Sequence, residues 1–235
     1  MKEENIAIIT ARGGSKRIPK KNIKKFCGEP IIAYSIRAAL ESKLFDEVMV
    51  STDSEEIAEI VMQYGATVPF MRSEAASNDY ATTADVVMEV LSEYAKRGRE
   101  FTYTCCIYPT APFVNATKLC EAMQKIKETD AIQLTPVVSF SFPPQRGFVI
   151  GADGLMRYKF PECKDKRSQD LEKMYHDAGQ FYIYKTKPYM EANGRVAQGI
   201  IPFVMSELEV QDIDNEEDWK IAEVKYRLLR ESGER

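Results

Sequence analysis

Short apolar runs alternate with amphipathic segments of helical length over the first 135 residues, and this alternation restricts the possible folds more than any other feature. The apolar runs predict buried strands at 6–10, 47–52, 66–70, 103–108 and 131–138. The segments between them predict helices at 30–42, 53–65, 82–98 and 115–129. Strands that alternate with helices typically form parallel sheets covered on both faces. We therefore predict an α/β protein with a mostly parallel sheet flanked by helices.

Residues at the ends of two of these helices are typical of helix termini. Pro30 suits the first turn, where its fixed φ and missing N–H are tolerated. Asp53 or Ser54 can cap the following helix, and Gly65 can end it.

The alternation stops at about Ser139 and resumes at about Gln180. The stretch between them is rich in turn-forming and charged residues, and "GADG" between two apolar runs predicts a β-hairpin. We expect one domain over 1–235, with 139–180 inserted as a small β-rich subdomain. After it we expect strands at 180–185 and 200–205, a short helix at 187–194 and a closing helix at 215–231, capped by Asp214 or Asn215.

Composition narrows the possible classes of protein. The 235-residue chain has a net charge of −4, which argues against general nucleic-acid binding. Its five cysteines form no CxxC pair, so we expect reduced thiols and no structural zinc. No stretch of 18 apolar residues and no signal-peptide apolar core is present, so we expect a cytoplasmic protein with no membrane partner.

The first predicted strand leads into "ARGGSKRIPKKNIKKF", a segment with seven basic residues and no acid, here called the basic loop (residues 11–26). Loops that follow parallel strands lie at the ligand-binding edge of the sheet. Gly13 and Gly14 allow a tight turn whose N–H groups form an anion-binding nest, and Ser15 adds a hydroxyl. Arg12, Lys16 and Lys21 add positive charge, so the loop predicts a triphosphate site.

Two simpler interpretations of the basic loop are a solvated charged face and a nuclear-localisation or RNA-contact patch. Neither explains paired glycines directly after a buried strand. The Walker pattern GxxxxGK[ST] and the pattern GxGxxG are both absent, which disfavours a Walker-type ATPase and a dinucleotide-binding protein.

Near the other end of the chain, "DID" places Asp212 and Asp214 two residues apart, in what we call the twin-acid segment (212–214). In extended backbone, residues i and i+2 point the same way, so both carboxylates can face one site. Carboxylates together with substrate phosphates typically hold Mg²⁺. The alternative is that Asp214 caps the last helix and Asp212 is a solvated neighbour.

The segment "ARGGSKRIPKKN" resembles the N-terminal signature of the sugar-acid cytidylyltransferases, the CMP-sialic acid synthetase family. The resemblance continues, in the family's order, through "STDSEEIAEIVMQYGA", "RSEAASNDYATTADVV", "YPTAPF", "RSQDLEKMYHDAGQFY" and "DIDNEEDW". "IYPTAPF" and "RSQDLEKMYHDAGQFYIY" look most like the members that activate pseudaminic acid, whereas sialic acid enzymes more usually carry Gln-Pro-Thr-Ser-Pro at 108–112.

The resemblance implies the Rossmann-like nucleotide-diphospho-sugar transferase fold and a Mg²⁺-dependent transfer of CMP from CTP to a nine-carbon sugar acid, with release of pyrophosphate. Pseudaminic acid is the favoured acceptor, and N-acetylneuraminic acid and legionaminic acid are the alternatives. From a different class, a nucleotide sensor without turnover and an RNA-binding protein remain as hypotheses. The family pairs two subunits through the inserted segment, so a homodimer is implied.

The resemblance also implies roles for individual residues. The nucleotide would be bound by Arg12, Gly13, Gly14, Ser15, Lys16, Asn22 and Arg72. Lys21 would neutralise charge at the α-phosphate, and Arg72 would contact the cytosine, although Ser73 stands where the family usually has proline. The implied catalytic residues are Lys21, Arg12 and Asp214, and Mg²⁺ would be held by Asp212 and Asp214.

On the sugar side, the resemblance implies contacts from Tyr108, Arg167, Gln169, Tyr175 and Gln180. Arg167 is the candidate partner of the sugar's carboxylate, and it is a candidate to reach into a neighbouring subunit.

Two further residues have both a functional and a structural interpretation. His176, the only histidine, lies beside Asp177 and is either a proton carrier or a hydrogen-bonded structural residue. The resemblance of the surrounding segment also makes His176, Asp177 and Gln180 candidate sugar contacts. Asp53 is either a metal ligand, as in related nucleotidyltransferases, or a helix N-cap, and we favour the cap.

Overall fold

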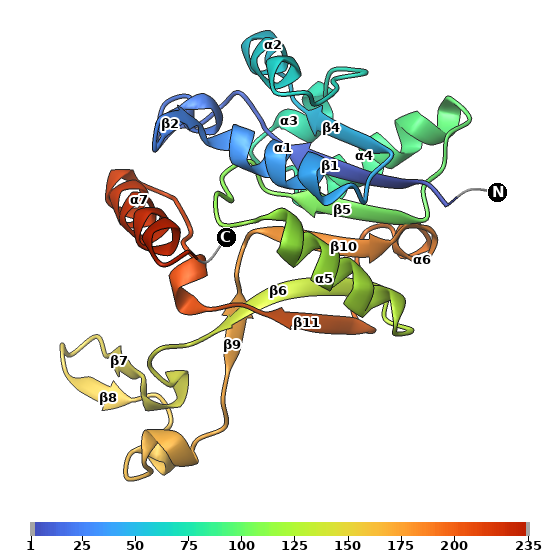
Figure 1. Ribbon diagram of the computed structural model, residues 1–235. Helices are drawn as coiled ribbons and strands as arrows, with labels where there is room; N and C mark the ends of the chain where they lie inside the picture. Colours follow the sequence, from blue (N-terminus) through green and yellow to red (C-terminus); the bar gives the residue numbers. More distant parts are fainter. Residues whose placement is uncertain (1–2, 234–235) are drawn as a thin grey trace.

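The apolar runs build one seven-stranded sheet in the computed structural model, which describes residues 3–233 (Figure 1). Its main path runs β11-β6-β10-β5-β1-β4, and β9 pairs with β6 beside it. The strands are β1 Asn5–Thr10, β4 Glu47–Ser51, β5 Tyr103–Ile107, β6 Gln133–Ser139, β9 Tyr175–Asp177, β10 Phe181–Lys185 and β11 Ile200–Val204. The predicted α/β class is confirmed.

The sheet is mixed rather than wholly parallel. β1 pairs in parallel with β4 and β5, and β11 pairs in parallel with β6. β10 is antiparallel to both β5 and β6. The reason is its connection: β10 is entered from the returning inserted segment through β9, and not through a crossover helix, so it runs in the opposite direction.

Helices cover both faces of the sheet (Figure 1). Their bounds are α1 Ile31–Ser42, α2 Glu55–Gln63, α3 Glu74–Ser77, α4 Thr83–Lys96, α5 Ala116–Lys127, α6 Thr186–Glu191 and α7 Glu216–Glu231. Ala7 and Ile9 of β1 pack with α1, α2 and α5, whereas Ile6 and Ile8 pack with α4. Alternate side chains of a strand point to opposite faces, so each strand contributes to both cores.

The closing helix α7 brings the twin-acid segment to the basic loop. Asn215 caps α7 in a capping box, and Trp219 is buried against Phe26 with ring centroids 5.7 Å apart. Phe26 belongs to a small hairpin that the sequence did not predict, β2 Lys25–Phe26 and β3 Glu29–Pro30. Its turn residues Cys27 and Gly28 have φ of 46° and 106°, as type I′ turns require.

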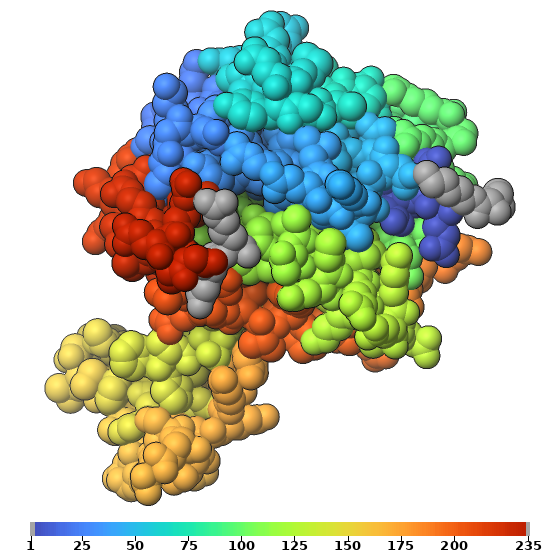
Figure 2. Space-filling model, viewed as in Figure 1, coloured from blue at the N-terminus to red at the C-terminus, as the bar shows by residue number. Residues whose placement is uncertain are grey.

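The inserted segment projects from the body as an arm (residues 140–174), the yellow part of Figures 1 and 2. It carries the predicted hairpin, β7 Phe148–Ile150 and β8 Met156–Tyr158, with Gly151–Gly154 in the turn. Its apolar side chains are largely exposed, with Phe142 at 86% and Ile150 at 77%. Residues 3–233 also form the 3₁₀ helices η1 Lys21–Ile23, η2 Pro144–Arg146, η3 Pro161–Cys163, η4 Ser168–Asp170 and η5 Glu207–Glu209.

The strand predicted at 66–70 is reduced to one bridge between Thr67 and Met49, and that prediction is wrong. The helix α3 was not predicted, because four residues are too few to show a helical period. Within residues 3–233, none of the helices combines the length and the apolarity needed to cross a membrane.

Candidate active site

The basic loop and the twin-acid segment share one cavity, although almost the whole chain separates them in sequence. This first cavity, of about 380 Å³, opens beyond the carboxyl end of β1. It is lined by Thr10, Arg12, Gly14, Ser15, Lys16, Arg17, Lys21, Asn22, Pro109, Thr110 and Asp214. Lys16 and Asp214 therefore face the same space.

The basic loop is fixed by hydrogen bonds at both ends. Gly13 donates its N–H to Asp53 Oδ1 at 2.7 Å, and Asn22 Nδ2 donates to the carbonyl of Arg12 at 2.8 Å. A Cβ on Gly13 would lie 3.0 Å from Ser54 Cβ, so a larger residue would have to displace the N-cap of α2 slightly. Gly14 has no such restriction, since a Cβ there would meet nothing within 4 Å.

These contacts also correct two interpretations of acidic residues. Asp53 does not cap α2; Ser54 does, by accepting from the N–H of Ile57. Asp214 does not cap α7, because Asn215 holds that position. Both aspartates are thereby available to the basic loop: Asp53 holds Gly13, and Asp214 binds Arg17 at 2.7 Å.

Two cations of the loop are bridged by one carboxylate that the sequence did not single out. Asp79 contacts Arg12 at 3.0 Å and Lys16 at 2.6 Å. The hydrogen bond from Lys16 is the main reason that the pKa of Asp79 lies below its usual value. Acids are common in polar loops, so nothing in the sequence marked Asp79 as a partner of residues more than 60 positions away.

Lys21 lies between the two acids of the twin-acid segment. Its Nζ donates to the carbonyl of Ile213 at 2.6 Å. Burial lowers the pKa of Lys21, and the Asp214 and Asp212 carboxylates oppose this shift. This hydrogen bond thus connects η1, which contains Lys21, to the twin-acid segment before α7.

Arg72 lies behind the basic loop and does not line the first cavity. It is 8% exposed and donates to the hydroxyl and the carbonyl of Ser51 at the end of β4. Burial lowers its pKa, and the charge of Asp53 opposes that shift. Its role toward the cytosine stays a prediction.

A second cavity, of 430 Å³, lies beside the first. Tyr108 lines it, whereas the next residues Pro109 and Thr110 line the first cavity. Its remaining lining residues are Val138, Ser139, Ser141, His176, Asp177, Ala178, Gly179, Glu207, Val210, Gln211, Asp212 and Lys225. Asp212 therefore lines this cavity and Asp214 lines the first, so the twin-acid segment lies where the two cavities adjoin. That both carboxylates hold one cation stays a prediction.

Four of the residues implied to contact the sugar lie away from this cavity in the same chain. Arg167 and Gln169 are exposed near η4 on the arm, and Tyr175 is exposed on β9 beneath Lys173. Gln180 is 2% exposed, and its Nε2 donates to the carbonyl of Glu209, which holds η5 in place.

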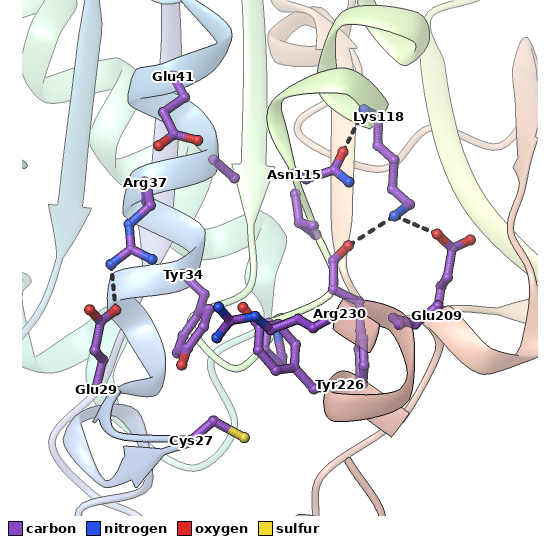
Figure 3. A pocket seen from close by; sticks show the side chains of 15 residues that line it. Cys27, Glu29, Tyr34, Arg37, Glu41, Asn115, Lys118, Glu209, Tyr226 and Arg230 are labelled. Carbon is purple, nitrogen blue, oxygen red and sulfur yellow. Dashed lines mark hydrogen bonds and ion pairs between the residues drawn. The ribbon is translucent and has the colours of Figure 1, made fainter. Parts of the chain in front are cut away.

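A third cavity, of 440 Å³, lies between α1, α5 and α7 (Figure 3). Figure 3 shows Lys118 paired with Glu209 at its wall and Arg37 paired with Glu29 across from them. None of the residues implied to bind nucleotide, sugar or metal lines it.

Residues 6–210 match the family of proteins described as cytidylyltransferases. The chain belongs to the cytidylyltransferase family. This confirms the family and the enzyme class predicted from the sequence, a nucleotidyltransferase.

Individual relatives agree with this assignment. The pseudaminic acid cytidylyltransferase of Campylobacter jejuni is 40% identical over 231 residues, which cover 98% of this chain and 99% of that protein. The CMP-N,N'-diacetyllegionaminic acid synthase of Legionella pneumophila is 31% identical over 236 residues, covering 97% and 98%. A solved structure of CMP:2-keto-3-deoxy-manno-octonic acid synthetase complexed with CTP has the same fold, with a TM-score of 0.70 and 16% identity, covering 97% of this chain and 100% of that one.

In this cytidylyltransferase, the twin-acid segment has donors suited to a hard divalent cation. Asp212 and Asp214 offer carboxylate oxygens, the ligand type that Mg²⁺ prefers. Among residues 3–233 there is no group of three or more histidine, cysteine, aspartate or glutamate side chains placed to hold a metal. A cation here would therefore complete its shell with phosphate oxygens and water, which is the usual mode for Mg²⁺.

Proposed function

We propose that this cytidylyltransferase transfers CMP from CTP to the anomeric hydroxyl of pseudaminic acid and releases pyrophosphate. The observation that carries the proposal is the 40% identity, over nearly the full length of both chains, to a pseudaminic acid cytidylyltransferase. The shared cavity of the basic loop and Asp214 supports it, because it places positive charge and a carboxylate around one space large enough for phosphates.

In the proposed reaction, the anomeric oxygen attacks the α-phosphorus of CTP, a P–O bond forms, and the bond to the β-phosphate breaks with pyrophosphate leaving. Arg12, Ser15 and Lys16 would bind the phosphates, and Lys21 would neutralise charge at the α-phosphate. Such transfers depend mainly on positioning and charge neutralisation. The hydroxyl proton leaves to solvent, and no protein base is assigned.

We propose Mg²⁺ as the cofactor, held by Asp212 and Asp214. When bound, it would offset phosphate charge and lower the pKa of the attacking hydroxyl. Arg17 would release Asp214 for this purpose, since the two side chains are paired at 2.7 Å.

We place the sugar acid in the second cavity and propose that a homodimer completes it. The described acids that line this cavity are Asp177, Glu207 and Asp212. Its one lysine, Lys225, already donates to the carbonyls of Glu207 and Val210. A sugar carboxylate therefore needs a cation from elsewhere, and Arg167 on the arm of a second copy has the required chemistry.

Pyrophosphate release from CTP tests the proposal. Pseudaminic acid should give turnover with Mg²⁺, and N-acetylneuraminic acid and N,N'-diacetyllegionaminic acid should give at least roughly tenfold lower kcat/KM. Faster turnover with either alternative would reassign the acceptor. CTP binding without turnover for any of the three acids would favour the nucleotide-sensor hypothesis.

The same assay tests the metal ligands. Asp214→Asn should lower kcat by about 100-fold or more while the protein stays folded, because one oxygen ligand becomes a neutral amide. Glu216→Gln is the matched control: this acid is close in sequence but pairs with Lys24 outside the cavity. Parental turnover by Asp214→Asn would remove Asp214 from the metal site.

A further inference from the structure

A fixed carboxylate forms part of the wall of the second cavity. Asp177 Oδ1 accepts the N–H of Gly179 at 2.7 Å, and the hydroxyl of Tyr182 lies 2.9 and 3.0 Å from its two oxygens. Asp177 and Gly179 both line the cavity. Each carboxylate oxygen has two lone pairs, so acceptor capacity remains on the side that faces the cavity.

Tyr182, which holds this carboxylate, is itself buried and packed. It is 8% exposed, and its ring contacts that of Tyr108 edge-on at 5.5 Å. Tyr108 in turn is fixed through its hydroxyl, 3.1 Å from Thr83 Oγ1 at the start of α4. Burial, with the neighbouring Tyr108 and Asp177, raises the pKa of Tyr182 well above that of a free phenol, so its hydroxyl remains a donor.

We propose that Tyr182 is a positioning residue that fixes Asp177 to accept an N–H or O–H group of the sugar acid, and that this pair contributes to acceptor specificity. The inference rests on the proposed function and extends it. An anionic acceptor selects substrates that present a donor and repels the substrate's own carboxylate. The sugar acid therefore binds with its carboxylate turned away from Asp177 and with an amide or hydroxyl group toward it.

The substitution Tyr182→Phe tests this role, because it removes the hydroxyl and keeps the ring that packs on Tyr108. The KM for the sugar acid should rise roughly tenfold, while the KM for CTP and kcat stay within about twofold. Tyr184→Phe is the matched control on the same strand: Tyr184 is also buried, but it stacks on Tyr189 and does not contact Asp177.

A double-mutant cycle separates positioning from a general effect on folding. If Tyr182 acts through Asp177, Tyr182→Phe should change the sugar KM little in the background of Asp177→Asn. A purely structural tyrosine would lower Tm and leave the ratio of the two KM values unchanged. An unchanged sugar KM in Tyr182→Phe, or additive effects in the double variant, would overturn the inference alone. Absence of turnover by the parent enzyme would overturn the proposed function itself.

Discussion

At the scale of single residues, the carboxylates of the site pair with cations of the basic loop. Asp79 bridges Arg12 and Lys16, and Asp214 binds Arg17, so three cations of the basic loop are paired with carboxylates. All of these side chains are substantially exposed, and such pairs exchange readily with a competing anion. A triphosphate that binds Arg12 and Lys16 must therefore displace Asp79.

Asp79→Asn should lower the KM for CTP by about two- to fivefold, because the variant removes the competing carboxylate and an exposed pair contributes little energy. Steady-state kinetics at varied CTP measure the effect. Asp153→Asn is the control, since Asp153 forms a similar exposed pair with Arg157 on the arm. A rise in the KM for CTP would show that Asp79 assists nucleotide binding instead.

Lys21 should give turnover a pH dependence. Burial lowers its pKa, so the ammonium is lost at a lower pH than that of an exposed lysine. If that charge acts at the α-phosphate, kcat should fall as the pH rises through the lowered pKa. Lys21→Arg keeps its charge at high pH and should move this decline upward. A pH profile identical in both proteins would exclude Lys21 as its cause.

At the scale of secondary-structure elements, the hydrophobic periodicity predicted most helices and strands of the body. It did not predict the direction of a strand, and it did not predict elements that are too short to show a period. The strand at β10 was predicted, but its antiparallel direction was not, because an apolar run such as Phe181–Lys185 carries no record of how the chain enters it. The hairpin β2–β3 has two residues on each side, too few for a pattern. The basic loop and Asp214 were predicted to meet, whereas Asp79 reaches the loop through long-range contacts that no local motif marks.

The packing of α7 should couple stability to activity. Trp219 is 3% exposed and packs against Phe26 beneath the twin-acid segment. Trp219→Ala should lower the free energy of unfolding by about 3–5 kcal/mol, as large-to-small core changes do. Urea unfolding measures this loss, and kcat should fall with it because Asp214 loses its support. Ile221→Ala on the exposed face of α7 is the control. An unchanged unfolding midpoint for Trp219→Ala would contradict this account.

At the scale of the whole molecule, the arm is a part where the single chain leaves apolar side chains exposed. It stands away from the body in Figures 1 and 2, and several of its apolar side chains are exposed. Apolar surface of this kind, on a segment that also carries Arg167, fits a contact between copies of the chain.

Ile150→Asp should convert the proposed dimer to monomers, because it places a charge at a largely exposed apolar position of the arm hairpin. Light scattering after size exclusion measures the mass, and turnover with the sugar acid should fall while CTP binding persists. Met62→Asp is the control, because it places the same charge at an exposed apolar residue of α2, away from the arm. Dimers that survive Ile150→Asp would place the contact elsewhere.

The strand β9 is both the root of the arm and, through Asp177, part of the wall of the second cavity. Three residues of backbone paired with β6 therefore connect the arm to the position of that carboxylate. By thermodynamic reciprocity, an acceptor that tightened this wall would strengthen the association of subunits in the proposed dimer to the same degree that association would strengthen acceptor binding.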